Sequence, residues 1–387
     1  MIYDALVVGL GAMGSAGLYQ LSKRSRNVCG IDRFSPPHPF GSTHGDTRIT
    51  RQAIGEGEHF VPLALRSYEI WDELERLSGN RLLTITGGLF VGNEQSALLT
   101  RNKPGWLKTT IAASERYGIA HRILDKAALR REYPQFHYAE TDIGYLEEKA
   151  GFLRPELCIT TQLAQARANG ADVRTNETML SFEEVGDEVR VRTDRGEYRT
   201  RQLILTTGSW VLESLRDTPW RDLLQVYRQV LYWFDVESAW ESYRPERFPV
   251  FILSDRSLYG FPAVDGPAGG IKIAKENYTD PTTPDAVDRT VSEAETRRMY
   301  EEVIRPDFHG IGSGCVKAVV CLYTMTPNGD FLIDRHPDCR RVLVTSCCSG
   351  HGFKHSAAVG QILSDLALDG RTDFDLSRFR FDQFAKL

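Results

Sequence analysis

Hydrophobic and polar residues follow a pattern in the N-terminal segment that predicts a strand, a helix and a second strand. Residues 2–8 form a short apolar run rich in β-branched side chains, which is typical of a buried parallel strand. A helical pattern follows through about Lys23, and residues 27–31 form a second apolar run. This order predicts a βαβ unit at the start of an α/β domain.

The pattern over residues 60–206 predicts a mixture of helices and short strands. Helices are expected over 60–78, where Gly79-Asn80 supplies the stop signal, over 104–133, and from Pro155 to about Asn169. The expected strands are 83–86, 88–92, 172–175, 180–185, 188–193, 197–201 and 202–206. Turn residues separate the strands between 180 and 201, which predicts a meander.

The pattern changes after about Leu224. Residues 226–236, 248–254, 257–261 and 271–274 are rich in aromatic and branched side chains and predict an antiparallel sheet of their own. A helix is expected over 293–304, ended by Pro306, and a strand over 316–324. Residues 342–345 predict a further strand, and 353–368 a last helix that closes at Gly370.

The first turn of the chain carries the G-x-G-x-x-G pattern at Gly9, Gly11 and Gly14, and the second strand ends at Asp32. Gly9 permits a tight turn, Gly11 lets backbone N–H groups approach a pyrophosphate, and Gly14 lets the helix pack closely on the strand. The helix N-terminus favours phosphate charge, and Asp32 can accept hydrogen bonds from a ribose. Together these features predict a dinucleotide site.

The segment after Asp32 indicates which dinucleotide binds. Residues 33–51 are rich in Pro, Gly and Ser, where a simple nicotinamide domain would continue with another βα unit. Two further glycine turns precede expected helices, at 207–210 and 349–354. Distant loops that return to one nucleotide suit a large cofactor, so flavin is favoured over nicotinamide. The cofactor-binding residues expected on these segments are Gly9, Gly11, Met13, Gly14, Asp32, Arg33, Ser42, Thr43, Gly208, Gly350, Gly352, Phe353 and Lys354.

The fold class expected from these patterns is α/β, with a Rossmann-like FAD-binding domain and a second, antiparallel-sheet domain that binds the substrate. A chain of 387 residues is long enough for two domains. The FAD-binding domain would be discontinuous and comprise residues 1–82, 150–222 and 318–387. The substrate domain would comprise residues 83–149 and 223–317.

Composition and charge argue against several other classes of protein. The chain is 41% hydrophobic and 26% charged, as in ordinary globular proteins, and its net charge of −5 implies no basic face for nucleic acid. No apolar run approaches the roughly 20 residues that cross a bilayer, and no signal-peptide pattern opens the chain, so a cytoplasmic location is expected. The seven cysteines show neither a disulfide framework nor metal-ligand spacing, so no metal site is expected.

Several stretches resemble, in the same order along the chain, the monomeric sarcosine oxidase and N-methyltryptophan oxidase family. This family belongs to the D-amino-acid-oxidase-like flavoenzymes, as do pipecolate oxidase and the fructosyl amino acid oxidases. The resemblance runs nearly end to end, and its most specific stretches are PPH (36–38), GDTRITR (45–51), GEGE (55–58), VPLALR (61–66), YGFP (259–262), VCLYT (320–324), IDRHP (333–337) and SGHGFK (349–354).

The resemblance implies how the cofactor is attached. FAD would be linked covalently, through its 8α-methyl group, to the thiol of Cys321. His44 and Arg48 would lie against the flavin. The other six cysteines are interpreted as small buried side chains.

The resemblance also implies which residues act on substrate and oxygen. Arg51 and Lys354 would hold the substrate carboxylate, Tyr259 and Tyr323 would line the pocket, and Lys272 would activate oxygen beside the flavin N5. These residue types suit these roles, because an arginine presents a planar fork to a carboxylate and an ammonium adds a point charge. A buried ammonium also stabilises the negative charge of reduced flavin and of superoxide.

Glu276 departs from the sarcosine-type members, which carry histidine four residues after the lysine. Oxidation requires a neutral substrate amine, and a nearby carboxylate would raise the pKa of that amine and oppose the reaction. If Glu276 lines the pocket, it would therefore face another part of the substrate, such as hydroxyls or a second cation. The fructosyl amino acid oxidases resemble this chain in having an acid at this spacing. Alternatively, Glu276 pairs with Lys275 and contacts no substrate.

The expected activity is that of a monomeric flavoprotein oxidase acting on a secondary α-amino acid and oxygen. Hydride would pass to flavin N5, water would hydrolyse the resulting imine, and oxygen would be reduced to hydrogen peroxide. An N-methyl amino acid is the leading substrate, followed by a cyclic imino acid (proline, pipecolate or thiazolidine carboxylate) and then a glycated amino acid. The alternatives from other classes are a dehydrogenase that uses a quinone or a partner protein, a flavoprotein without catalysis, and a nicotinamide dehydrogenase.

Overall fold

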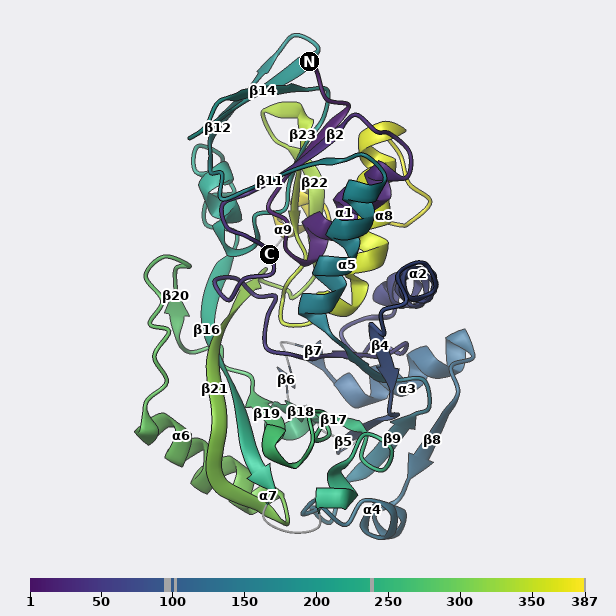
Figure 1. Cartoon of the computed structure of the whole chain (residues 1–387). Coiled ribbons are helices and arrows are strands. Elements are labelled where there is room, and N and C mark those ends of the chain that lie inside the picture. Colours follow the sequence, from purple (N-terminus) through teal and green to yellow (C-terminus); the bar gives the residue numbers. More distant parts are fainter. Residues whose placement is uncertain (94–98, 101–102, 237–239, 386–387) are drawn as a thin grey trace.

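The computed structural model describes residues 1–93, 99–100, 103–236 and 240–385. Figure 1 shows an upper part built around one sheet and a lower part built around another, with two long strands running between them. These strands are β16 (Gln225–Val236) and β21 (Ile311–Met325), which pair antiparallel along most of their length. The connection between the two parts is therefore a hydrogen-bonded ribbon.

Within the described residues, the upper part contains a six-stranded sheet in the order β11-β2-β1-β15-β23-β22. Every neighbouring pair is parallel except β22–β23. The strands are β1 (Ala5–Val8), β2 (Val28–Asp32), β11 (Asp172–Thr175), β15 (Leu203–Leu205), β22 (Leu332–His336) and β23 (Cys339–Ser346). Three separate regions of the sequence thus contribute strands to one sheet.

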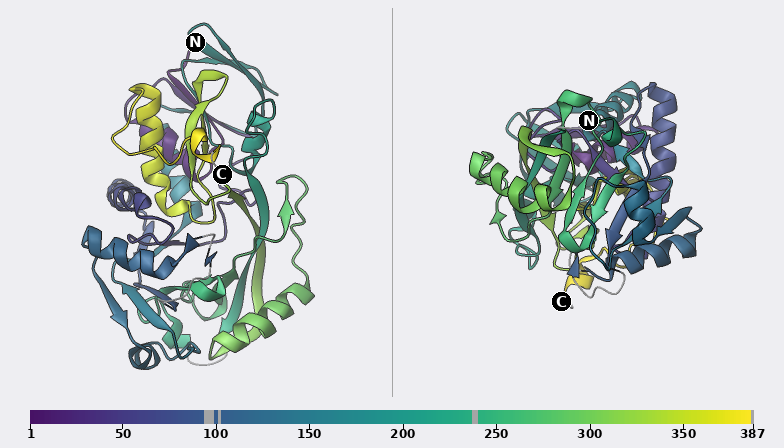
Figure 2. Two further views of the ribbon diagram at one scale, coloured as in Figure 1. Left: turned by 180° about the vertical axis from the view of Figure 1, so that it is seen from behind. Right: turned by 90° about the horizontal axis from the view of Figure 1, so that it is seen from below.

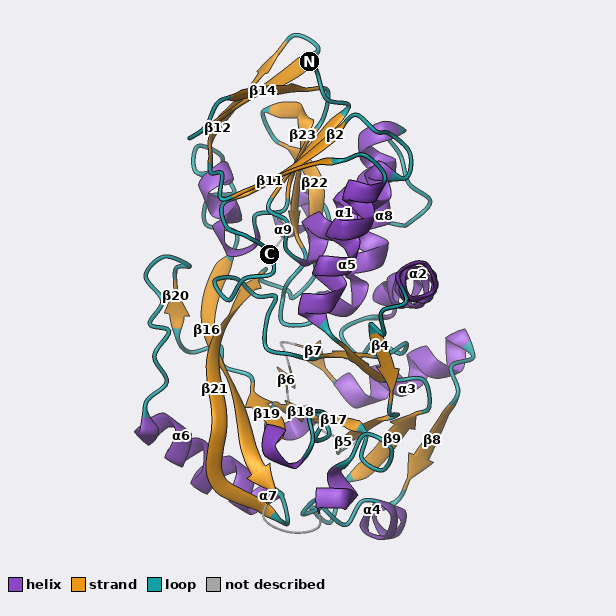
Figure 3. Ribbon diagram, in the orientation of Figure 1, coloured by secondary structure: helices purple, strands orange, loops and turns teal. Residues whose placement is uncertain are grey.

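The two faces of this sheet are covered differently, as Figure 3 shows. Helices α1 (Ala12–Ser22), α5 (Pro155–Ala168) and α8 (Ser356–Leu368) lie on one side, where Val7 packs in the same cluster as Leu18 and Leu363. The predicted meander lies on the other side and consists of β12 (Met179–Val185), β13 (Glu188–Thr193) and β14 (Glu197–Thr200). Both faces of the parallel strands are therefore buried, which explains their continuous apolar sequence.

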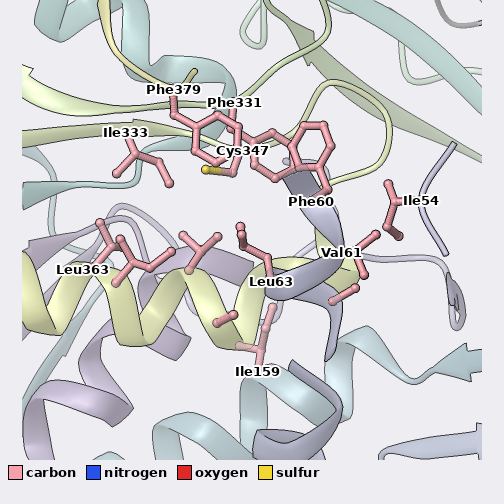
Figure 4. Close-up of a cluster of buried hydrophobic side chains, with 14 of the residues drawn as sticks. Ile54, Phe60, Val61, Leu63, Ile159, Phe331, Ile333, Cys347, Leu363 and Phe379 are labelled. Atoms are coloured by element: carbon pink, nitrogen blue, oxygen red, sulfur yellow. The ribbon is translucent and has the colours of Figure 1, made fainter. Parts of the chain in front are cut away.

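Helix α2 (Val61–Ser78) packs against α8 and begins inside the largest buried cluster. Figure 4 shows part of this cluster, including Phe60, Phe331 and Phe379. The ring of Phe60 lies 4.7 Å from that of Phe331 and 5.5 Å from that of Phe379, between ring centroids. These contacts join the start of α2 to the C-terminal segment of the chain.

Within the described residues, the lower part contains a nine-stranded sheet in the order β20-β16-β19-β18-β17-β5-β9-β8, with β21 on β16. Its other strands are β5 (Gly88–Gly92), β8 (His121–Leu124), β9 (Ile143–Glu147), β17 (Val250–Leu253), β18 (Leu258–Gly260), β19 (Ile271–Lys275) and β20 (Pro281–Thr282). Of the strand pairs that the structure describes in this sheet, only β17–β5 is parallel. The predicted antiparallel sheet is confirmed, and strands from before residue 150 extend it.

Most of the remaining elements connect the two parts or cover the lower sheet, and Figure 2 shows the chain from behind and from below. The C-terminal helix α9 (Phe381–Phe384) differs, because Phe381 and Phe384 pack in the same buried cluster as Leu6 of the upper sheet. A small sheet consists of β3 (Arg48–Thr50), β10 (Gly151–Leu153) and β4 (Leu83–Ile85). The other elements are β6 (Leu99–Thr100), β7 (Lys103–Pro104), α3 (Trp106–Tyr117), α4 (Lys126–Glu132), α6 (Glu293–Met299) and α7 (Arg305–Asp307). Among the helices in the described part of the chain, none has the length and apolar character that crossing a membrane requires.

Two expected helices differ from those observed. Residues 104–133 do not form one helical segment, because Gly118 ends α3 in a left-handed conformation and Asp125 caps α4, which leaves room for β8 between them. The helix expected over 293–304 is α-helical only to Met299, continues as one π-helical stretch, and then extends to Asp307. Pro306 is tolerated there because it lies in the first turn of α7.

Candidate active site

The glycine turn brings β1 and the N-terminus of α1 into close contact. A Cβ on Gly14 would lie 1.8 Å from the carbonyl oxygen of Gly9, and Gly9 itself has φ +90°. Gly11 differs, because a Cβ there would meet nothing closer than Thr43 Oγ1 at 3.8 Å. Helix α1 has no side-chain cap and no acidic residue in its first turn. Gly11, Ala12 and Met13 line a cavity, so the uncapped N–H groups at the start of the helix suit an anion there.

Asp32 ends β2 beside this turn. Its Oδ2 accepts a hydrogen bond from Leu10 N at 2.6 Å, and its Oδ1 accepts one from Phe34 N at 2.7 Å. Burial raises the pKa of the Asp32 carboxyl, and the two backbone N–H groups oppose that shift. The next residue, Arg33, lies 3.6 Å from Glu213 and 3.7 Å from Asp285 between charged atoms.

A cavity of about 620 Å³ extends from the glycine turn towards the lower sheet. Its volume lies within the range of small-molecule and cofactor sites. The predicted cofactor residues in its wall are Gly9, Gly11, Met13, Asp32, Arg33, Ser42, Thr43, Arg48, Gly208, Cys321, Gly350, Gly352, Phe353 and Lys354. Gly14 and His44 are not in the wall. Gly14 shapes the glycine turn, and His44 is buried behind the cavity wall.

The loop at 349–353 closes against the strand that carries the predicted attachment residue. Gly350 has φ +74°, and a Cβ there would lie 2.9 Å from the Tyr323 ring. Only glycine allows this approach without a steric clash. Strand β21 thereby places Cys321 and Tyr323 in the wall of the same cavity.

Cys321 is buried next to Arg48. The Arg48 Nη2 atom lies 3.7 Å from Cys321 Sγ, and the sulfur lies 3.6 Å from the carbonyl oxygen of Ser42. Burial raises the pKa of the Cys321 thiol, and the Arg48 guanidinium acts in the opposite direction. Arg48 is itself fixed by the carbonyl oxygens of Thr47 and Ser42, each at 2.8 Å.

Two further buried groups lie behind this part of the wall. Burial and the nearby charge of Arg48 lower the pKa of His44 to about 3, so its imidazole is neutral. Lys272 on β19 donates to the carbonyl oxygens of Gly45 at 2.6 Å and of Thr47 at 2.8 Å. Burial lowers the pKa of Lys272 well below its usual value. Lys272 does not line the cavity.

The end of the cavity that faces the lower sheet is cationic and lined by phenols. Arg51 is only 1% exposed and pairs with Glu56, with Nη2 and Oε2 2.5 Å apart. Lys354 donates to the carbonyl oxygen of His351 at 2.6 Å. The hydroxyls of Tyr259 and Tyr323 lie 3.2 Å apart. Arg51, Lys354 and both tyrosines are in the wall, so four of the residues expected at the substrate site line the same cavity.

Burial determines the protonation state of Tyr259, and Glu276 lies close to this tyrosine. Burial raises the pKa of Tyr259 to about 12, and the phenol is therefore neutral at physiological pH. Glu276 is buried, accepts a hydrogen bond from the Tyr278 hydroxyl at 2.9 Å, and does not line the cavity. Its charge contributes to the raised pKa of Tyr259, so it lies near the phenols. Lys275, by contrast, is exposed to solvent.

Some residues of the site were not expected from the sequence. Glu56 is the buried counterion of Arg51. Glu156, at the start of α5, accepts hydrogen bonds from the N–H groups of Gly45 and Asp46. Cys348 lines the cavity, with its sulfur 4.0 Å from Ser42 Oγ. The only sequence signal for Glu56 was its position in the stretch 55–58.

Comparison with known proteins identifies the family. The model of the FAD-dependent oxidoreductase family matches residues 4–366. This chain belongs to that family. This chain is 37% identical over 385 residues to a monomeric sarcosine oxidase from Streptomyces avermitilis. The alignment covers 97% of this chain and 96% of the relative. The chain is 31% identical over 398 residues to an N-methyl-L-tryptophan oxidase from Escherichia coli, covering 99% of this chain and 100% of the relative.

This FAD-dependent oxidoreductase has the same fold as a protein of known structure. NikD, an amino acid oxidase essential for nikkomycin biosynthesis, aligns with a TM-score of 0.83 and 22% identity, covering 98% of this chain and 97% of NikD. At this identity the likeness establishes the fold alone. It confirms the expected fold class, in which a FAD-binding domain is joined to a second, sheet-based domain.

The residues of the cavity fit FAD. The uncapped start of α1 offers N–H groups to a pyrophosphate, and Asp32 stands at the strand end where a ribose is held. The hydroxyl of Thr207 lines the cavity, is buried, and has no hydrogen-bond partner among the described residues, as is expected for a group that contacts a ligand. A buried wall that contains Arg48, Cys321 and the tyrosine pair suits the flavin end.

Proposed function

We propose that this FAD-dependent oxidoreductase is an oxidase of secondary α-amino acids, with an N-methyl amino acid such as sarcosine or N-methyltryptophan as its leading substrate. The single observation that carries the proposal is the cationic end of the cavity, where Arg51 and Lys354 line the same wall as the paired tyrosines. Such an end attracts a carboxylate. The names of the curated relatives support the choice of substrate class.

Arg51 and Lys354 bind the substrate carboxylate in this proposal. The carboxylate competes with Glu56 for the Arg51 guanidinium, since the two now form a buried pair. The aromatic rings of Trp106 and Phe90 lie 4.8 and 5.6 Å from that guanidinium and limit the directions in which it can move. The protein thus holds Arg51 ready without leaving its charge unpaired.

Tyr259 and Tyr323 orient the amine end of the substrate, and burial of the site excludes water. Tyr259 is available as a neutral hydrogen-bonding group, because its pKa is raised to about 12. When bound, FAD supplies the acceptor of a hydride equivalent from the carbon attached to nitrogen, and it returns two electrons to oxygen as hydrogen peroxide. Lys272 supports the oxygen step by holding positive charge behind the cavity wall.

Cys321 carries the flavin covalently in this proposal. Its sulfur is buried in the cavity wall, and the Arg48 guanidinium beside it favours the thiolate needed to form the bond. Acid precipitation tests the linkage. The protein should leave its yellow colour in the pellet, and Cys321→Ser should release it into the supernatant. Cys348→Ser is the matched control, because Cys348 lines the same cavity, and it should keep a yellow pellet. A yellow pellet from Cys321→Ser would contradict the assignment.

A peroxide assay under air, with no added electron acceptor, tests the reaction class. We expect hydrogen peroxide from an N-methyl amino acid, and a KM that rises at least about tenfold in Arg51→Met, because a buried charged hydrogen bond to the carboxylate is lost. Peroxide from cyclic imino acids alone, or from glycated amino acids alone, would move the substrate to those classes. Flavin reduction by substrate without peroxide would identify a dehydrogenase and refute the oxidase.

Two further parts of the proposal concern the protein as a whole. We propose a monomer, which size-exclusion chromatography with light scattering tests directly against the chain mass of 43.7 kDa. We also retain the cytoplasmic location expected from the sequence, and cell fractionation tests it. A stable dimer, or recovery of the protein outside the cytoplasmic fraction, would overturn the corresponding part.

A further inference from the structure

Lys272, Trp233 and Lys317 form one rung across three neighbouring strands. Trp233 on β16 pairs with Lys272 on β19 on one side and with Lys317 on β21 on the other. Directly paired residues project from the same face of a sheet. The ammonium of Lys272 lies 5.3 Å from the centroid of the indole and that of Lys317 lies 4.6 Å from it. The indole therefore lies between the two lysine side chains.

Both lysines of the rung reach the same loop. Lys272 donates to the carbonyl oxygens of Gly45 and Thr47, the two residues that flank Asp46. Lys317 lies 2.8 and 3.1 Å from the two carboxylate oxygens of Asp46. Glu156 accepts hydrogen bonds from Gly45 N at 2.6 Å and Asp46 N at 3.1 Å. The loop is thus held by contacts to its carbonyl groups, its amide groups and the Asp46 carboxylate.

We propose that Asp46 and Lys317 set the charge and position of Lys272: Asp46 acts as the counterion of its ammonium, and Lys317 shares that carboxylate and so limits its interaction with Lys272. Asp46 and Lys317 are positioning residues, since neither lines the cavity. The inference rests on the oxygen role proposed above for Lys272.

Among the charged groups around Lys272, Asp46 is the one whose effect on the Lys272 pKa depends on Lys317. Charged and titratable groups face Lys272 from segment 44–48, from α5 and from β21; they are His44, Asp46, Arg48, Glu156, Lys317 and Cys321. Burial and Arg48 lower the pKa of Lys272, whereas Cys321, Asp46 and Glu156 raise it. Cys321 carries no charge once it is linked to flavin, and Glu156 is engaged by two backbone N–H groups. Asp46 is then balanced mainly by Lys317.

The two residues should shift the pKa of Lys272 in opposite directions. Asp46→Asn removes the counterion and should lower that pKa by about one pH unit, which is typical of the loss of one nearby charge in a partly shielded site. Lys317→Met leaves the carboxylate unshared and should raise it. A loss of structure alone would move the pKa in the same direction in both variants, so the sign of the shift separates the two explanations.

Nuclear magnetic resonance of protein labelled with [ε-¹³C]lysine measures this pKa without turnover. The Lys272 signal is assigned by its loss in Lys272→Met, and the purified flavoprotein is titrated with pH as wild type, Asp46→Asn, Lys317→Met and Lys317→Arg. Lys317→Arg keeps the positive charge and should restore the wild-type value. Lys23→Met is the matched control, because Lys23 also makes a 2.7 Å ion pair, with Glu73, and lies 5.4 Å from the ring of Tyr19. It should leave the Lys272 signal unchanged.

The oxygen reaction supplies the functional reading. Stopped-flow reoxidation should slow in Asp46→Asn at a pH where the wild type still reacts fast, and flavin reduction by substrate should change little. If Lys272→Met leaves reoxidation unchanged, the oxygen role of Lys272 fails, and the titration still judges the Asp46–Lys317 pair. If Lys272→Met slows reoxidation but Asp46→Asn and Lys317→Met shift the Lys272 pKa in the same direction, or leave it unchanged, the pair is refuted and the role of Lys272 stands.

Discussion

Replacing Glu56 by glutamine should destabilise the protein and, at the same time, make the cavity bind carboxylates more tightly. Arg51 and Glu56 are 2.5 Å apart between Nη2 and Oε2, and each side chain is only 1% exposed. Glutamine keeps the shape and one carbonyl acceptor but removes the negative charge. The Arg51 guanidinium then keeps its bond to the Ala53 carbonyl oxygen and loses its paired carboxylate.

The size of the effect follows from the burial of the pair. Removing one member of a buried ion pair costs about 3 kcal/mol or more, and the hydrogen bond that glutamine retains reduces this to about 2–3 kcal/mol. For a chain of 387 residues, an unfolding entropy of roughly 2 cal/mol/K per residue converts that cost into a fall in Tm of about 3 °C. A carboxylate ligand that replaces the missing charge should recover about 1.4 kcal/mol, which is a tenfold gain in affinity.

Thermal unfolding with and without acetate measures both effects. Acetate should raise the Tm of Glu56→Gln more than that of the wild type. Glu147→Gln is the control, because Glu147 is equally buried and accepts hydrogen bonds from Gln52 N and Ala53 N of the same loop. It should lose stability without gaining affinity for acetate. Equal acetate effects in the wild type and in Glu56→Gln would refute the idea that a ligand carboxylate reaches Arg51.

Two other substitutions test the packing of the site. His355 is fully buried, and neither ring nitrogen has a hydrogen-bond partner among the described residues, so burial lowers its pKa well below 6.5. The unfolded chain therefore binds a proton that the folded protein does not. For an unfolded pKa near 6.5, the free energy of unfolding falls by about 1.3 kcal/mol from pH 7.5 to 5.5. His355→Phe should remove that part of the pH dependence in denaturant titrations. Gly14→Ala places a Cβ 1.8 Å from the Gly9 oxygen, so the purified protein should lack flavin absorbance. Gly196→Ala, where a Cβ meets nothing within 4 Å, should remain yellow, and a yellow Gly14→Ala protein would contradict the packing argument.

The parts of the fold that follow from local spacing could be predicted from the sequence. The strand, glycine turn, helix and Asp32 are determined by residues close together in the chain, and the structure places them as expected. Strands β9 and β10 were not predicted, because each is short and contains or adjoins glycine. Their strand conformation depends on neighbours such as β5 and β3, which are distant in sequence.

Some residues of the candidate site could likewise be predicted from the sequence, and others could not. The wall residues of the glycine turns follow from their motifs. Pairing between Arg51 and Glu56, or between Lys317 and Asp46, does not, because the partners in such ion pairs follow no period in the sequence. Lys317 is 271 residues from Asp46 in the chain, and only the register of β21 on β16 brings it next to Trp233. The sequence therefore indicates which cofactor binds, but it does not indicate which ion pairs form around the site.

The position of β23 late in the chain affects how the holoenzyme is made. β23 lies between β15 and β22, and the loop that follows it completes the wall with Gly350, Gly352 and Lys354. While the ribosome is still translating the preceding segments, the nascent N-terminal half has only part of its parallel sheet and an open groove. We therefore expect flavin to bind only after β23 and this loop have been synthesised, and chains that are terminated before β23 should be colourless.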